Sequence, residues 1–310
     1  MLAIPTRGIC RSVKEHNVQL DIFSDWIEGS VLFDEPQLSS TDIVDILCEH
    51  LIYDEQDFGY EIVEDAWCEL RRRSSCMDAR CAFSITASQI VRVREWQNAP
   101  GQSFCVLLAL ATWYAGWAKQ FGSDYTEQGE LFEELTKESL VQQFSGWYVH
   151  QTGWSRSHSK KLSEVIDEIT DKLGESRGSP EIWADPDANE AGLDLLCYRP
   201  FIDNRVGIPV YLMQCASGGN WKEHQKLKTP DISDWCRYVQ FAARPGKAFA
   251  IPFALLDDEF RRCCGKVGGM LLDRCRILGS GGLEDNWISD ELKQRIVAWM
   301  LPRVSKLPRE

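Results

Sequence analysis

The stretch that decides the fold runs from Leu193 to Cys215 and reads LDLLCYRPFIDNRVGIPVYLMQC. Its two ends, 193–198 and 210–215, are apolar runs of strand length. The connection between them carries Pro200, the pair Asp203-Asn204 and Gly207, which are residues typical of turns. This order of apolar run, turn residues and apolar run predicts a β-hairpin.

Outward from this hairpin, helical spacing of apolar residues dominates the chain. The spacing predicts helices over 39–51, 65–73, 103–121, 127–144, 159–173 and 290–300, a helical segment from Trp221 onward, and a further strand at 249–253. We therefore predict an α/β protein in two parts. Residues 1–120 form a mostly helical region, and residues 121–310 form an α/β domain that ends in a C-terminal helical extension.

Charge is distributed unevenly along the 310 residues, whose formal net charge is −13. Residues 1–150 carry 11 basic and 24 acidic side chains, whereas residues 151–310 carry 23 of each. The acidic first half argues against nucleic-acid binding there. The stretch from Gln214 to Lys247 contains six basic and three acidic side chains. That stretch is either a phosphate-contacting surface or an ordinary solvated helix face.

The 12 cysteines are scattered, and the sequence contains no Cys-x-x-Cys pair. This pattern favours reduced cysteines that serve as small apolar residues, and therefore a reducing, cytoplasmic compartment. The longest uncharged apolar run, 104–118, is too short for a membrane span and predicts a buried helix, so we expect no membrane association.

Two polar residues interrupt the hairpin strands, where polar side chains are costly to bury. Asp194 stands near the start of the first strand and Gln214 near the end of the second. In an antiparallel hairpin these two positions are neighbours. Glu190 precedes the first strand and Lys222 follows the second, so the set suits a hard cation such as Mg²⁺. The alternative is structural: a buried aspartate bonded to turn amides and a glutamine that ends a strand.

These residues resemble the core of the PD-(D/E)XK nuclease superfamily, and more narrowly its Mrr-like branch. In that branch Gly-x-Asp opens one strand, as Gly192-Leu-Asp194 does here, and Gln-x-Lys closes the next, where this chain has Gln214-Cys-Ala216. Upstream, Gly129-Glu-Leu-Phe-Glu133 is similar to the Gly-x-x-Phe-Glu of that group's first helix. The resemblance covers about 125–260. It implies a restriction-endonuclease-like mixed central sheet flanked by helices, and cleavage of DNA that depends on Mg²⁺ or Mn²⁺.

Carried over to this chain, the resemblance assigns a site. Asp194 would be the central metal ligand, Gln214 a second ligand through its amide oxygen, Glu133 the acid contributed by a helix, and Glu190 an auxiliary ligand. The sequence departs from the family where Ala216 replaces its lysine. Lys222 is the substitute expected from the next helix, and Lys226 is the second choice. The residues expected to contact DNA are Lys222, His224, Lys226 and Lys228.

Three functions follow from these observations. The first is a DNA endonuclease of a bacterial restriction or anti-phage defence system, whose acidic N-terminal half contacts a protein partner and which can form oligomers. The second is a catalytically degenerate nuclease fold that acts as a DNA-binding subunit or scaffold, which Ala216 favours. The third is a helical interaction protein, which requires that the two apolar runs are not strands.

Overall fold

A computed structural model describes residues 1–5, 7–10, 18–53, 56–122, 125–152, 161–183, 191–279 and 287–310. The chain divides into two compact units. Unit 1 comprises Met1–Ser123, Pro252–Leu256 and Arg274–Glu310, and unit 2 comprises Asp124–Ile251 and Asp257–Asp273. The first limit falls close to the expected boundary at 120. The C-terminal region, which the sequence analysis placed with the α/β domain, is part of unit 1.

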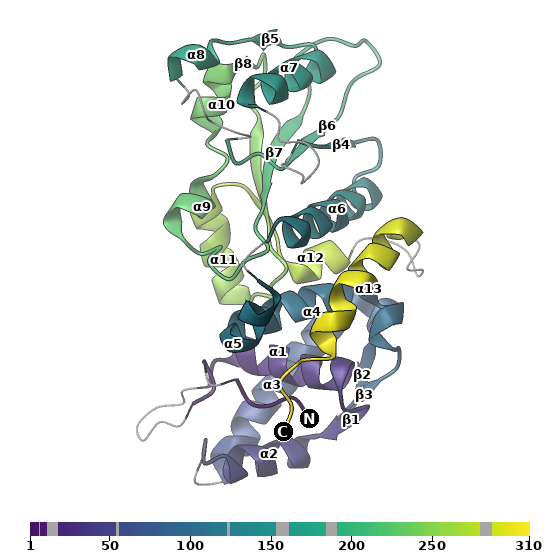
Figure 1. Ribbon diagram of the computed structural model, residues 1–310. Helices are drawn as coiled ribbons and strands as arrows, with labels where there is room; N and C mark the ends of the chain where they lie inside the picture. The colour runs from purple at the N-terminus through teal and green to yellow at the C-terminus, as the bar shows by residue number, and fades with distance from the viewer. Residues whose placement is uncertain are drawn as a thin grey trace. The chain divides into compact units, whose positions relative to one another are not determined.

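Unit 2 is built on a mixed five-stranded sheet with the strand order β10-β9-β7-β6-β4 (Figure 1). The strands are β4 (Tyr148–Gln151), β6 (Leu195–Tyr198), β7 (Val210–Cys215), β9 (Gly246–Ala250) and β10 (Met270–Leu272). The predicted hairpin is confirmed, because β6 and β7 pair antiparallel with Leu196 opposite Leu212. β4 is also antiparallel to β6, whereas β7, β9 and β10 run parallel to one another. These strands exclude the purely helical alternative.

Helices cover both faces of this sheet. α6 (Thr126–Gln143) runs alongside β4 and β7 (Figure 1), and α7 (Leu162–Leu173) packs on the other face. Successive residues of β4 establish the two faces, because His150 contacts Glu168 of α7 and Gln151 donates to Glu133 of α6. Leu212 of β7 packs in the α7-side core. The expected sheet flanked by helices is therefore present, as a mixed α/β architecture.

The remaining elements of unit 2 lie on either side of the β6–β7 hairpin in the sequence. They are α8 (Pro180–Trp183), α9 (His224–Lys228), α10 (Ile232–Tyr238), α11 (Asp257–Val267) and a short pair, β5 (Ser176–Arg177) with β8 (Val239–Gln240). The predicted strand at 249–253 is displaced, because β9 begins at Gly246 and ends before Pro252. Gly269 allows β10 to lie beside it, since a Cβ at this residue would come within 2.2 Å of the Lys247 carbonyl oxygen.

Unit 1 is largely helical, as predicted for the N-terminal region. Its helices of five or more residues are α1 (Leu20–Phe33), α2 (Ser40–Glu49), α3 (Gln56–Met77), α4 (Pro100–Trp113), α12 (Arg274–Leu278) and α13 (Asp290–Val304). Shorter helical segments are η1 (Asp78–Arg80), η2 (Trp96–Asn98), α5 (Ala115–Ala118) and η3 (Lys119–Phe121). A small antiparallel sheet, β1 (Gln37–Ser39), β3 (Gln89–Arg92) and β2 (Phe83–Ile85), was not predicted. The predicted start of α2 is confirmed by a capping box between Ser39 and Asp42.

The predicted helix over 103–121 is only partly correct. α4 begins at Pro100 and ends at Trp113, and the short α5 and η3 take its place up to Phe121. Residues 100–110 are all buried, as expected for an apolar helix. In the part of the chain that the structure describes, no helix combines the length and apolar character that a bilayer crossing requires.

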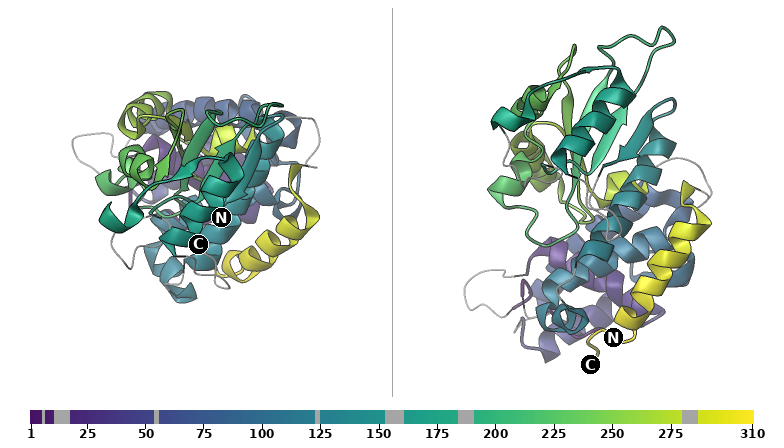
Figure 2. Two further views of the ribbon diagram at one scale, coloured as in Figure 1. Left: turned by 90° about the horizontal axis from the view of Figure 1, so that it is seen from above. Right: turned by 45° about the horizontal axis from the view of Figure 1, so that its top comes forward.

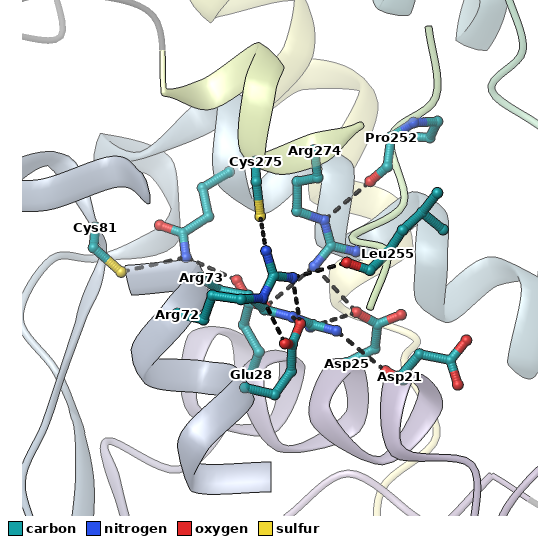
Figure 3. Close-up of polar contacts among 12 residues, drawn as sticks. Asp21, Asp25, Glu28, Arg72, Arg73, Cys81, Pro252, Leu255, Arg274 and Cys275 are labelled. Carbon is teal, nitrogen blue, oxygen red and sulfur yellow. Dashed lines mark hydrogen bonds and ion pairs between the residues drawn. The ribbon is translucent and has the colours of Figure 1, made fainter. Parts of the chain in front are cut away.

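A cluster of buried ion pairs ties the separate pieces of unit 1 together (Figure 3). Arg73 of α3 and Arg274 of α12 are each 1% exposed, and both contact Asp25 and Glu28 of α1. Glu69 binds Arg73 at 2.8 Å. The cluster explains why residues after 273 belong with the N-terminal helices. Arg72 and Arg73 form these ion pairs from inside α3, which continues to Met77, beyond the predicted end of the helix at Arg73.

The two ends of the chain lie side by side in unit 1 (Figures 1 and 2). Leu2 forms a β-bridge with Arg309, and the N-terminal ammonium group lies 2.9 Å from Asp34. The guanidinium of Arg309 contacts the same carboxylate at 2.7 Å. The ammonium and Arg309 together hold the pKa of Asp34 below its ordinary value, against the opposing effect of burial.

Candidate active site at the start of the β6–β7 hairpin

Asp194 sits at the residue before β6 and is 9% exposed. Its backbone N–H donates to Met213 O at 2.9 Å, and its carbonyl accepts from Thr152 N at 2.8 Å. Its carboxylate Oδ2 accepts from the backbone N–H of Cys215 at 2.6 Å. The side chain therefore takes the place of a main-chain acceptor at the start of the hairpin. This bond to a backbone amide is what the structural alternative predicts for a buried aspartate, and it accounts for one of the two carboxylate oxygens.

Gly192 shapes the turn in front of Asp194. Its φ of +69° lies in the region that favours glycine, and a Cβ there would come within 1.8 Å of Thr229 Cγ2. The same Cβ position is 3.9 Å from Gln214 Nε2. The glycine of the Gly-x-Asp motif is thus required by this turn and by the close approach of the segment after α9.

Glu133 is the helix-borne acid that the sequence predicted. It projects from α6, is 9% exposed, and its Oε2 accepts from Gln151 Nε2 of β4 at 3.0 Å. Glu133 and Asp194 both act on the Cys215 thiol. Burial is the main cause that raises the pKa of this thiol well above its ordinary value, and the two carboxylates add to it. Asp194 and Glu133 therefore both lie in the neighbourhood of the Cys215 thiol.

Gln214 faces the other side of the sheet. Alternate residues of a strand point to opposite faces, so Gln214 shares the α7 side with Leu212. Cys215 shares the α6 side, where its thiol contacts Thr136. Gln214 Oε1 is buried, and no hydrogen-bond partner for it occurs among the described residues. Gln214 and Glu133 of the expected set thus lie on opposite faces of the sheet.

The proposed lysine substitutes are engaged elsewhere in unit 2. Lys222 is 52% exposed, and its Nζ lies 2.6 Å from Glu259 Oε1 of α11. Lys226 Nζ donates to Asn220 Oδ1 at 2.5 Å. Ala216 is buried and donates its N–H to Ala250 O, which continues the sheet. The side chains predicted to contact DNA, from Lys222 to Lys228, nevertheless form one basic segment on and just before α9, with all but Lys226 exposed.

Lys247 is a basic residue that the sequence analysis counted but did not place in the site. It lies on β9 opposite Leu212, is 8% exposed, and donates from Nζ to Leu227 O at 2.7 Å. Burial lowers its pKa to about 8. The sequence marks this residue only as a single charge next to the apolar run 248–251. The predicted strand began at residue 249 and therefore did not include Lys247.

Whether these residues can hold a metal depends on the donors available. Among the residues that the structure describes, no three His, Cys, Asp or Glu side chains are grouped to hold a metal ion, and Glu190 lies outside the described residues. Mg²⁺ requires only one or two carboxylates, with water and phosphate oxygens completing its shell. Asp194 and Glu133 fit that requirement.

Comparison with known proteins adds nothing to this assignment. No family model matches the chain, and no curated protein or solved structure matches it.

Proposed function

We propose that unit 2 is a metal-dependent phosphodiester hydrolase of the PD-(D/E)XK type that acts on DNA. The observation that carries the proposal is that Asp194 and Glu133, two buried acids from different elements, both lie close enough to the Cys215 thiol to act on its charge. The mixed sheet with helices on both faces supports it, because this is the architecture that the motif resemblance implies.

The proposal gives each side chain a role. Asp194 and Glu133 would hold the Mg²⁺ or Mn²⁺ ion, which when bound activates water and stabilises charge on a phosphate. The hydrogen bond from Cys215 N orients Asp194, and the amide of Gln151 orients Glu133. The basic segment 222–228 would contact DNA phosphates, and Lys222 is the cation nearest in sequence to the end of β7.

Metal binding is the first test. In a thermal unfolding experiment on the full chain, Mn²⁺ should raise the melting temperature, because a ligand that binds only the folded state stabilises it. Asp194→Asn and Glu133→Gln should each remove that rise. Glu127→Gln, an exposed acid of the same helix α6, is the matched control and should retain it. An equal rise in all four proteins would refute these ligands.

Cleavage is the second test. We expect the wild type to nick supercoiled plasmid in Mn²⁺, and Asp194→Asn to lose this activity while retaining DNA binding. Lys222→Gln should reduce cleavage if Lys222 takes the role of the family's lysine, which Ala216 replaces here. Loss of cleavage in Lys222→Gln with unchanged DNA affinity would assign it that role, and loss of affinity alone would place it in DNA contact.

The scaffold alternative keeps two specific observations in its favour. The position of the family's lysine is occupied by a buried alanine, and Lys222 is paired with Glu259. A wild-type protein that binds DNA, shows no thermal response to Mg²⁺ or Mn²⁺ and cuts no plasmid would establish this second function. The contact of the acidic first half with a protein partner, the cytoplasmic location, the role in defence and the oligomeric state stay predictions.

A further inference from the structure

The turn between β6 and β7 presents large apolar side chains to solvent. Ile202 is 103% exposed, Phe201 is 54% exposed and Val206 is 47% exposed. Single exposed apolar side chains are ordinary on protein surfaces, whereas several that gather on one segment mark a contact site. The turn therefore carries a surface that the proposed metal site does not use.

The backbone of this turn is fixed. The N–H of Asn204 donates to the carbonyl of Phe201 at 3.1 Å, which closes a β-turn. Ile202 and Asp203 are the two central residues of this turn. Pro200, directly before it, restricts the backbone further. The apolar side chains are consequently held in place before a partner binds, which lowers the entropic cost of binding.

Two arginines flank the apolar tip of the turn. Arg199 precedes it and is exposed, and its guanidinium forms no hydrogen bond or ion pair with the residues that the structure describes. Arg205 is 84% exposed, and its Nε lies 3.8 Å from Asp203, a distance at which an exposed ion pair contributes little. A partner that carries negative charge on both sides of an apolar insertion site would match this surface.

The side chains of the turn favour DNA among the partners that could receive an apolar tip. A few side chains are too small a surface for a stable protein interface, which buries about 800 Å² on each partner. A lipid bilayer would have to take up Asp203 together with Ile202, because the two are adjacent at the tip, and a carboxylate in hydrocarbon is costly. In a DNA duplex an apolar side chain enters between bases, while its polar neighbours stay among the hydrogen-bonding groups of the groove.

We propose that the β6–β7 turn is a wedge that inserts Ile202 between two base pairs of a DNA duplex from the minor groove and kinks the duplex. Arg199 and Arg205 contact the phosphates on either side, and Phe201 packs against the unstacked base. The inference rests on the proposed function, because it takes DNA as the ligand of unit 2. The four residues of β6 separate the turn from Asp194 by about 13 Å. A duplex that lies along the hairpin would therefore be kinked at least about four base pairs from the proposed metal site.

Fluorescence of 2-aminopurine tests the wedge in the absence of cleavage. The full chain is mixed, in EDTA, with duplexes that carry this base at a T-A step, which unstacks easily. Because stacking quenches 2-aminopurine, its fluorescence should rise on binding. Ile202→Ser should abolish the rise and weaken binding about tenfold, as expected for the loss of one buried apolar side chain. Val93→Ser, which removes another exposed β-branched side chain from unit 1, is the matched control and should change neither.

The salt dependence of binding tests the arginines. Arg199→Gln should weaken binding and lower the slope of log affinity against log salt concentration by about one, as the loss of one phosphate contact does. Ile202→Ser should leave this slope unchanged, since its contact with DNA is apolar. Both variants should fold as the wild type does, because both side chains are exposed and a backbone hydrogen bond closes the turn.

Two results would overturn the wedge. The first is DNA binding by the wild type with no rise in fluorescence, or with an equal rise in Ile202→Ser, and it would leave the hydrolase proposal to the Mn²⁺ and cleavage experiments. The second is an absence of DNA binding. Binding to vesicles of phosphatidylcholine and phosphatidylserine that Ile202→Ser loses would then assign the turn to a membrane surface instead.

Discussion

Replacing Arg274 with methionine tests whether the buried ion cluster holds unit 1 together. The substitution keeps an unbranched side chain and removes the guanidinium, whose Nη1 lies 3.1 Å from both Asp25 Oδ1 and Glu28 Oε2. Its Nε also donates to Pro252 O at 3.0 Å. Arg73 would then be the guanidinium left to neutralise the two carboxylates of α1 in this cluster.

The magnitude follows from the burial of the partners. Asp25 is 3% exposed and Glu28 is 0% exposed, so neither carboxylate can recover its hydration after the loss of Arg274. Removing one partner of a buried ion pair costs about 3–5 kcal/mol, because the remaining charge stays buried. At about 2–4 °C for each kcal/mol in a unit of this size, the melting temperature should fall by roughly 6–20 °C.

Differential scanning calorimetry can assign the loss to unit 1, since two units can unfold in separate transitions. Arg276→Met, on the exposed side of the same helix α12, is the control and should change stability by less than about 0.5 kcal/mol. The double variant Arg274→Met/Glu28→Gln should cost less than the sum of its parts, because it removes the stranded charge as well. A loss below about 1 kcal/mol for Arg274→Met would refute the reasoning.

Three other variants address unit 2. Gln214→Leu should raise the free energy of unfolding by about 1–3 kcal/mol, since it removes a buried acceptor that has no partner among the described residues; a loss of the Mn²⁺-induced thermal shift instead would make Gln214 a ligand after all. Gly192→Ala should destabilise by about 1–3 kcal/mol in urea unfolding, because φ is +69° and the new Cβ collides with Thr229. Burial lowers the pKa of Lys247 to about 8, so between about pH 8 and 10.5 the unfolded state binds more protons and wild-type stability gains with pH. The stability of Lys247→Met relative to wild type should therefore fall over that range in urea unfolding, and an unchanged difference would contradict the shift.

The elements that the sequence predicts well are those with a local cause. The β6–β7 hairpin follows from two apolar runs and the turn residues between them, and α2 follows from the capping pair Ser39 and Asp42. β4 escaped detection because its residues alternate between two helices with polar contacts on both sides, at His150 and Gln151. β9 was displaced because Lys247 interrupts its apolar pattern.

The candidate site shows the same division between local and distant causes. Asp194 and Glu133 both lie near the Cys215 thiol, since α6 packs against β4 and β7 where the hairpin begins. Gln214 was grouped with them because the two strand ends are neighbours. The alternation of side chains, however, sends Gln214 and Cys215 to opposite faces, and the packing of Leu212 in the α7-side core shows that Gln214 lies on the α7 side. Motif spacing therefore predicts at which end of the strands these residues lie, but not on which face of the sheet each side chain points.

The ion cluster also limits how the chain can be divided for experiments. Sequence composition suggests a boundary near 120, yet Arg274 comes from residues far beyond it and neutralises carboxylates of α1. A fragment that ends near Ser123 would leave Asp25 and Glu28 without this partner, as Arg274→Met does. The complementary fragment would carry an arginine that has lost its buried acids. Dividing the chain near residue 123 should therefore lower the stability of unit 1 by at least the amount expected for Arg274→Met. A partner or ligand of unit 1 should accordingly be sought with the full chain.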